Sequence, residues 1–385
     1  MAGRRLLLMH VTTSSGHHHA SQAIAHAAAR LDPTCQAINV DAFDFTTRIT
    51  RWAIMRSYMS VIRHHPDVWE YLYDNPDIHR HIRHFRQLLH RYHAHKLRRL
   101  LETVQPQAIA CTQAFPCGML ADFMMHDGLH IPIVGVLTDY APHVYWMHDA
   151  VDYYIVSSEA MKERFVSQGV PEARMRVYGI PVEPRFLDPV DREAAYRQFG
   201  LDAHLPVVMV MGGGGGFGPI RELVRSLDRV TPPCQFVVLT GTNQLLLAWL
   251  RRQPFRHRIA ASGYTDLIPD LMEISTLIIT KPGGLTTAES LAKHLPLMIV
   301  SPIPGQELCN ARFLLAEGAA AELGDPHIAG EVLSRLLRDQ NALQRMREHA
   351  ARLAHPDSAL RTAELLFELA DQSRQTAALV AGASG

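Results

Sequence analysis

The sequence predicts an α/β protein with two Rossmann-like domains, each built on a parallel sheet. One order of elements (apolar strand, small polar turn, helix, second strand) occurs at 6–40 and again at 206–240. This order is the opening of a doubly wound sheet. A chain of 385 residues is long enough for two such cores, and we expect a cleft between them.

In the first half, Leu6–Val11 and Gln36–Val40 read as strands on either side of an Ala-rich helix at 21–30. Short apolar runs of this kind are typical of buried parallel strands. Further strands are predicted at 108–112, 133–137, 151–157 and 176–178.

Residues 43–103 interrupt this alternation as an insertion rich in aromatic and basic residues. Positions 51–100 contain ten Lys and Arg against four Asp and Glu, a net charge of +6, with eight further His. One interpretation is a solvated helix face. The other is an amphipathic insertion that meets an anionic membrane surface, where each basic group contributes roughly 1 kcal/mol.

The second half repeats the pattern with strands at 206–211, 236–240, 277–280 and 297–300. Residues 326–373 have helical spacing, and a return of the last helix to the first domain is one option. The predicted divisions are an N-terminal domain at 1–186, a linker at 187–203, a second domain at 204–355, a C-terminal helix at 356–373 and a disordered tail at 374–385.

Composition narrows the classes of function. The chain has 38 Lys and Arg against 38 Asp and Glu, so no global field indicates nucleic acid. Five scattered cysteines without a CxxC pair are typical of a reduced, cytosolic chain without a zinc site. No apolar run approaches the roughly 18 residues of a membrane span, so we expect any membrane contact to come from the surface.

Residues 276–310 form a strand, a glycine turn, a helix, a strand and a polar loop. Backbone N–H groups and a helix N-terminus at the carboxyl end of a sheet make an anion site. Lys281 adds a positive charge beside the turn formed by Gly283 and Gly284. Thr286 and Glu289 match a capping box, or Glu289 takes the hydroxyls of a ribose. Gln306 and Glu307 suit sugar hydroxyls.

A run of five glycines follows the strand at 206–211. The run and its flank satisfy GxGxxG, but the next strand ends without the acidic residue of a dinucleotide site. The loop still suits a diphosphate, because its backbone N–H groups are not shielded by a Cβ. The alternative is a flexible turn without a ligand. The residues predicted to bind the diphosphate are Gly212, Gly213, Gly214, Gly215 and Gly216.

The corresponding turn of the first half reads Ser14-Ser15-Gly16-His17. A histidine at this edge of the sheet can act as a general base near neutral pH. His17, His18 and His19 also suggest a metal tract, but three adjacent residues at a helix start cannot all face one ion. No DxD sequence occurs, so we predict no metal site.

A third polar cluster follows the strand at 133–137. Asp139 either caps the next helix or orients His17 or the acceptor. Trp146 offers an apolar face for a lipid or sugar ring, and we assign His143 and His148 to the same acceptor site.

Four long motifs resemble the family-28 glycosyltransferases, within them the monogalactosyldiacylglycerol synthases and processive diacylglycerol glucosyltransferases. The resemblance covers about residues 5–370. The motifs are T-D-x-x-x-H-x-x-W-x-H-x-x-V-D-x-Y-x-V at 138–156, G-I-P-V-x-P-x-F at 179–186, I-T-K-P-G-G at 279–284 and P-I-P-G-Q-E-x-x-N-A at 302–311.

The resemblance implies a GT-B fold with a UDP-sugar donor held by the second domain. It implies metal-independent, inverting transfer of glucose or galactose from UDP to diacylglycerol or another lipid, without a cofactor. It also implies a cytoplasmic protein, peripheral on the inner face of the cell membrane. The family's Gly-Gly-Gly-His or Gly-Asn-Gly-His turn is Ser14-Ser15-Gly16-His17 in this chain.

The predicted mechanism is a single displacement with His17 and Asp139 as catalytic residues. Gly16, Gly263 and Tyr264 complete the predicted donor site. The alternatives are an N-acetylglucosamine transferase acting on a polyprenyl-linked or lipopolysaccharide intermediate, a UDP-sugar epimerase, and a non-enzymatic UDP-sugar-binding regulator.

Overall fold

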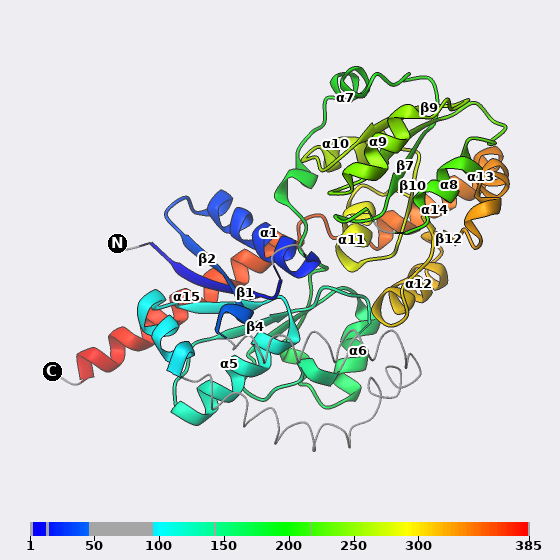
Figure 1. Ribbon diagram of the computed structural model, residues 1–385. Coiled ribbons are helices and arrows are strands. Elements are labelled where there is room, and N and C mark those ends of the chain that lie inside the picture. The colour runs from blue at the N-terminus through cyan, green and yellow to red at the C-terminus, as the bar shows by residue number, and fades with distance from the viewer. Residues whose placement is uncertain (1–2, 13–14, 46–94, 142–143, 217, 384–385) are drawn as a thin grey trace. The chain divides into compact units, whose positions relative to one another are not determined.

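Two α/β units make up the computed structural model, which describes residues 3–12, 15–45, 95–141, 144–216 and 218–383 (Figure 1). The first unit combines residues 1–184 with 357–385, and the second spans 185–356. Most of the predicted insertion at 43–103 therefore lies outside the described residues, as does its proposed membrane contact. Within that range, residues 42–45 form a short 3-10 helix and 95–104 are helical.

The first unit is a six-stranded parallel sheet in the order β2-β1-β3-β4-β5-β6. Its helices alternate with the strands, as expected for a doubly wound sheet. The strands are β1 (Arg5–His10), β2 (Gln36–Asp41), β3 (Ala108–Cys111), β4 (Ile133–Val136), β5 (Tyr153–Val156) and β6 (Met175–Val177). The helices are α1 (Gly16–Leu31), α5 (Ala114–Asp127), α6 (Glu159–Ser167) and α15 (Ser358–Ala383).

Alternate residues of β1 serve opposite faces of this sheet. Leu7 and Met9 join the core beneath α5, whereas Leu6 and Leu8 join the core beneath α1 and α15. Because successive strand side chains point to opposite faces, an apolar run such as this one fits a sheet that is covered on both sides.

The second unit is also a six-stranded parallel sheet, in the order β12-β11-β10-β7-β8-β9. Its strands are β7 (Val207–Met211), β8 (Gln235–Leu239), β9 (Arg258–Ser262), β10 (Leu277–Thr280), β11 (Leu297–Ile299) and β12 (Ala320–Glu322). Its helices are α7 (Arg192–Phe199), α8 (Ile220–Leu227), α9 (Gln244–Arg252), α10 (Ile268–Ile274), α11 (Gly284–Ala292), α12 (Gln306–Ala316), α13 (Ala329–Arg338) and α14 (Gln340–Arg352).

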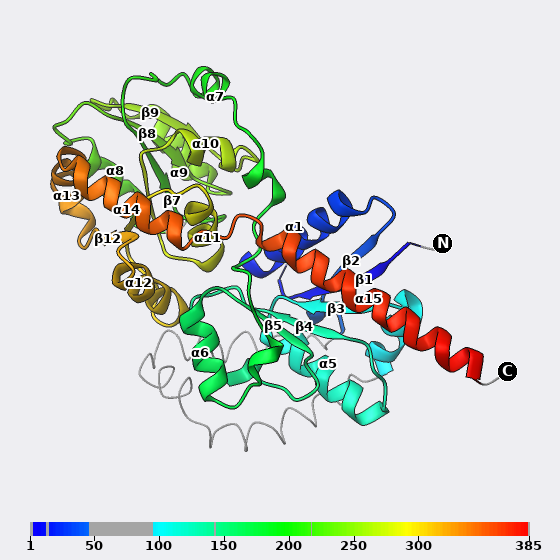
Figure 2. The ribbon, with the colours of Figure 1, turned by 180° about the vertical axis from the view of Figure 1, so that it is seen from behind.

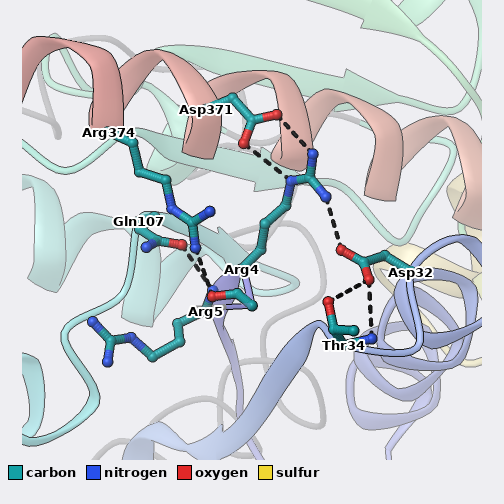
Figure 3. Close-up of polar contacts among 8 residues, drawn as sticks. Arg4, Arg5, Asp32, Thr34, Gln107, Asp371 and Arg374 are labelled. Atoms are coloured by element: carbon teal, nitrogen blue, oxygen red, sulfur yellow. Dashed lines mark hydrogen bonds and ion pairs between the residues drawn. The ribbon is translucent and has the colours of Figure 1, made fainter. Parts of the chain in front are cut away.

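The last helix lies along the first unit, beside α1 (Figure 2). Arg4 donates to both carboxylate oxygens of Asp371 at 3.1 and 2.8 Å and to Asp32 at 2.8 Å (Figure 3). Ser358 Oγ donates to the carbonyl of Gly179 at 2.8 Å. These contacts join the last helix to Arg4, just before the first strand, and to Gly179, just after the last strand of the sheet.

Two parts of the chain differ from the sequence-based prediction. The predicted linker at 187–203 contains the helix α7, which belongs to the second unit. The prediction of a disordered tail from 374 is wrong, because α15 continues to Ala383. The segment has no glycine or proline between Asp357 and Gly382, and its alanines favour helix. No helix in the described part of the chain has the length and apolar content that a bilayer span requires.

Candidate active site

His17 lies in the first turn of α1 at the carboxyl edge of the first sheet. Its Nδ1 is 2.9 Å from the carbonyl oxygen of Thr112 and 2.7 Å from Thr138 Oγ1. Thr112 directly follows β3, and Thr138 follows β4 by two residues. The hydroxyl of Thr112 also donates to the carbonyl of His17 at 2.8 Å. Residues that follow two neighbouring strands therefore hold one imidazole. We call this pair, Thr112 and Thr138, the threonine clamp.

The threonine clamp decides which nitrogen of His17 carries hydrogen. A carbonyl oxygen only accepts, so Nδ1 must donate to Thr112, and its N–H reaches Thr138 as well. Burial lowers the pKa of His17 to about 4, with His10 adding to the fall and the Thr112 carbonyl opposing it. At neutral pH the ring is uncharged, and the lone pair of Nε2 is left to take a proton.

The neighbouring histidine has a different partner. His18 Nδ1 lies 3.0 Å from Nε2 of the buried His10, and the two rings meet edge to face with centroids 4.4 Å apart. His17 and His18 thus turn to separate groups. Among the described residues, no three His, Cys, Asp or Glu side chains gather into a group that could hold a metal ion.

Asp139 directly follows Thr138 and shares the carboxyl edge with His17. Its carbonyl accepts from Ser157 Oγ at 3.0 Å, which fixes the backbone after β4. The Asp139 side chain is half-buried. Burial of Tyr140 raises the pKa of that phenol, and the neighbouring Asp139 carboxylate adds to the rise.

The other residues assigned to the acceptor have structural positions. Trp146 is only 4% exposed and belongs to the core of the first unit. The ring of His148 lies against α5, where a Cβ at Gly118 would come within 2.7 Å of its Nε2. Tyr154 Oη accepts from the backbone N–H of His148 at 2.8 Å. We therefore leave Trp146 and His148 out of the acceptor site, and His143 lies outside the described residues.

In the second unit, the glycine run Gly212–Gly216 follows β7. Gly216 has φ 60°, and a Cβ there would meet the carbonyl oxygen of Thr240 at 2.2 Å. The carbonyl of Gly214 accepts from Thr242 N at 2.9 Å, so the loops after β7 and β8 are joined. Packing alone therefore requires a glycine at Gly216.

Two other glycines have no such requirement. A Cβ on Gly214 or Gly283 would meet no atom within 4 Å, and neither residue has a positive φ. They follow β7 and β10, which are adjacent parallel strands with Met211 opposite Thr280. The two open backbones therefore lie at one edge of one sheet. The N–H of Gly283 already donates to the carbonyl of Lys281 at 2.9 Å, so a ligand at this edge can approach the N–H of Gly214 and the helix N–H groups that follow Gly283.

The helix after Gly283 leaves its first turn open. The N-cap of α11 is Gly283, without a side-chain cap. Thr286 therefore lies inside the helix, and the alternative of a capping box with Glu289 is wrong. The first N–H groups of α11 remain for an anion, with Lys281 half-buried just before the turn.

The loop after β11 completes this edge. Gln306 and Glu307 occupy the first turn of α12, where Glu307 Oε2 accepts from Ile303 N at 2.9 Å. The buried Asn310 donates to the carbonyl of Pro282 at 3.0 Å and so joins α12 to the Gly283 turn. After β9, Gly263 precedes Tyr264, which is 63% exposed.

Sequence reasoning overlooked three of these residues. Thr112 acts through its backbone, which no side-chain pattern reports. Thr138 and Asn310 both lie inside long motifs, and their spacing was the available signal.

The chain has two α/β units, each built on a sheet of parallel strands. One unit carries a clamped histidine and the other an open glycine edge, and together they define a glycosyltransferase of GT-B fold. Comparison with known proteins agrees. The family model for monogalactosyldiacylglycerol (MGDG) synthase matches residues 17–182, and that for the glycosyltransferase family 28 C-terminal domain matches 207–362. The chain belongs to glycosyltransferase family 28.

Individual relatives and solved structures are also similar to this chain, in sequence or in fold. The processive diacylglycerol beta-glucosyltransferase of Bacillus pumilus is 30% identical over 72% of each chain. The Staphylococcus carnosus protein of that name is 31% identical over 74% of this chain and 73% of its own. MurG of Acinetobacter baumannii has a TM-score of 0.61 at 16% identity, covering 95% of this chain and 99% of its own. UDP-GlcNAc 2-epimerase of Neisseria meningitidis has 0.59 at 13% identity, covering 94% and 99%.

Proposed function

We propose that this enzyme transfers a hexose, glucose or galactose, from a UDP-sugar to diacylglycerol, without a metal and with inversion at the anomeric carbon. The names of the relatives support the acceptor and the sugar class. The observation that carries the chemistry is the threonine clamp, because it places the hydrogen on Nδ1 and leaves Nε2 free of hydrogen, while burial keeps the ring neutral.

In the proposed step, His17 Nε2 takes the proton from the acceptor hydroxyl while that oxygen attacks the anomeric carbon. The bond from this carbon to the UDP oxygen breaks, and the electron pair leaves with UDP. Asp139 orients the imidazole or the acceptor from the same sheet edge. General-base assistance of this kind contributes about 10²–10⁴-fold.

The second unit would stabilise the leaving diphosphate with backbone dipoles. The N–H groups at Gly214 and the first turn of α11 supply these dipoles, and Lys281 adds charge. Glu289 would hold the ribose, and Gln306 and Glu307 the sugar. The exposed ring of Tyr264 offers a face to the uracil ring of UDP.

The test incubates the protein with diacylglycerol vesicles and one donor per tube: UDP-glucose, UDP-galactose or UDP-N-acetylglucosamine. We expect glycolipid from one of the first two, and equal yield with a chelator present. His17→Ala should lower turnover about 10²–10⁴-fold while UDP affinity stays within about twofold.

Three results would contradict the proposal. Product only with a polyprenyl-linked acceptor would favour the N-acetylglucosamine transferase. Conversion of the donor without an acceptor would favour the epimerase, and UDP-sugar binding without turnover would favour the regulator.

In the cell we place the enzyme on the cytoplasmic face of the membrane, where UDP-sugars and diacylglycerol meet.

A further inference from the structure

The second unit carries a basic and aromatic surface outside the candidate active site. Arginines recur every fourth residue along α8 and beyond it, at 221, 225 and 229, and all three are exposed. The opposite side of α8 is buried in the core. This stripe therefore faces solvent, although like charges four residues apart weaken a helix.

The stripe is joined to α9 through an indole ring. The guanidinium carbons of Arg221 and Arg225 lie 5.4 and 5.2 Å from the ring centroid of Trp249. One turn before Trp249, Leu245 is 81% exposed, and one turn after it Arg252 is exposed. We call this surface the arginine–tryptophan face: Arg221, Arg225, Arg229, Leu245, Trp249 and Arg252.

Little negative charge opposes the arginine–tryptophan face. No Asp or Glu occurs from 229 to 265, a stretch with five arginines. Of the two acids on α8 and its C-cap, Asp228 accepts from the backbone N–H of His257 at 3.0 Å, and Glu222 is half-buried. The face therefore has a strong excess of positive charge.

We propose that the arginine–tryptophan face binds the headgroup region of an anionic lipid bilayer. Arginines supply the attraction to lipid phosphates, whereas an indole beside an exposed leucine suits the boundary between headgroups and acyl chains. A nucleic acid would use the charge but gives Leu245 no apolar partner. This surface is additional to the proposed donor and acceptor sites, and rests on the proposed function only in that the acceptor is a membrane lipid.

The test measures partition of the full chain onto vesicles of phosphatidylcholine with and without phosphatidylglycerol. Arg225→Gln/Arg229→Gln should lower partition onto the anionic vesicles about 25-fold, since each arginine near such a surface contributes about fivefold. The control Arg345→Gln/Arg347→Gln removes two exposed arginines of α14 and should leave partition unchanged. Melting temperatures show that both variants are folded.

A second variant probes the apolar part. In high salt, where charge attraction is screened, Leu245→Ser should lower the remaining partition about fivefold. Unchanged partition of Arg225→Gln/Arg229→Gln, an equal fall in the control, or tighter binding of duplex DNA than of vesicles would overturn the proposal.

With diacylglycerol in neutral detergent micelles, Arg225→Gln/Arg229→Gln should keep wild-type turnover. Vesicle binding without turnover by the wild type would instead reject the proposed function alone.

Discussion

The substitutions Gly214→Ala and Gly283→Ala separate a ligand-binding role for a glycine from a folding role. In both cases the added methyl group meets no protein atom within 4 Å, and the backbone is outside the left-handed region. The folded state should tolerate each change. Because alanine restricts the unfolded chain more than glycine does, Gly214→Ala should be more stable by about 0.4–1 kcal/mol. Gly283 is the N-cap of α11, where alanine is less favourable than glycine, so the two effects should largely cancel in Gly283→Ala.

Donor binding should change in the opposite direction. If a phosphate oxygen approaches the N–H of Gly214 and the first N–H groups of α11 beside Gly283, each methyl group blocks at least one charge-assisted hydrogen bond. Such a bond contributes about 1.5–3 kcal/mol. The dissociation constant for UDP should therefore rise about 10- to 150-fold.

Calorimetric titration with UDP and thermal unfolding measure the two effects on the same samples. Gly128→Ala is the matched control, since it also places a methyl group in open space, but at φ 64° at the end of α5. It should lower stability by about 1–2 kcal/mol and leave UDP affinity unchanged. Folded Gly214→Ala and Gly283→Ala proteins with wild-type UDP affinity would refute the reasoning.

Three further predictions concern the first unit. Thr138→Val should lower kcat about tenfold and leave the KM for donor unchanged, while Thr138→Ser restores kcat; an equal loss in Thr138→Ser would contradict the clamp. The pKa of His17 falls from 6.5 to about 4 on folding, so its contribution to stability is present above pH 6.5 and lost as pH falls towards 4. Chemical denaturation should show His17→Gln losing less stability than the wild type between these pH values; parallel pH curves would argue against the shift. Asp371→Asn should lower the free energy of unfolding by about 1 kcal/mol through Arg4, whereas Glu193→Gln in an exposed i,i+4 pair should have no effect; equal changes would deny Asp371 a special role.

Strongly apolar strands could be predicted from the sequence, and Leu277–Thr280 was placed at its observed bounds. The strands Arg258–Ser262 and Ala320–Glu322 were overlooked because both are short, alanine-containing and only partly buried. Such edge strands take their conformation from the neighbouring strand rather than from their own residues.

Some residues of the candidate site could likewise be predicted from the sequence, and others could not. His17 was predictable because it follows a strand and starts a helix in one short segment. Its main partner, the carbonyl of Thr112, was not, because every residue has a carbonyl. The sequence suggested Trp146 as a ligand face, although its ring fills the core. Only the structure separates Gly216, which packing requires, from Gly214, which packing does not.

The return of α15 to the first unit has a consequence for biosynthesis. Residues Leu6, Leu8 and Ile24 share a core with Ala363, Leu366 and Ala370. During translation, the first domain therefore lacks one covering helix until residues 358–370 have been made. The second domain, complete within 185–356, can fold earlier. The first domain is thus completed only after the second has been made, and a stop codon shortly after residue 356 would leave the face beneath α15 covered by α1 alone.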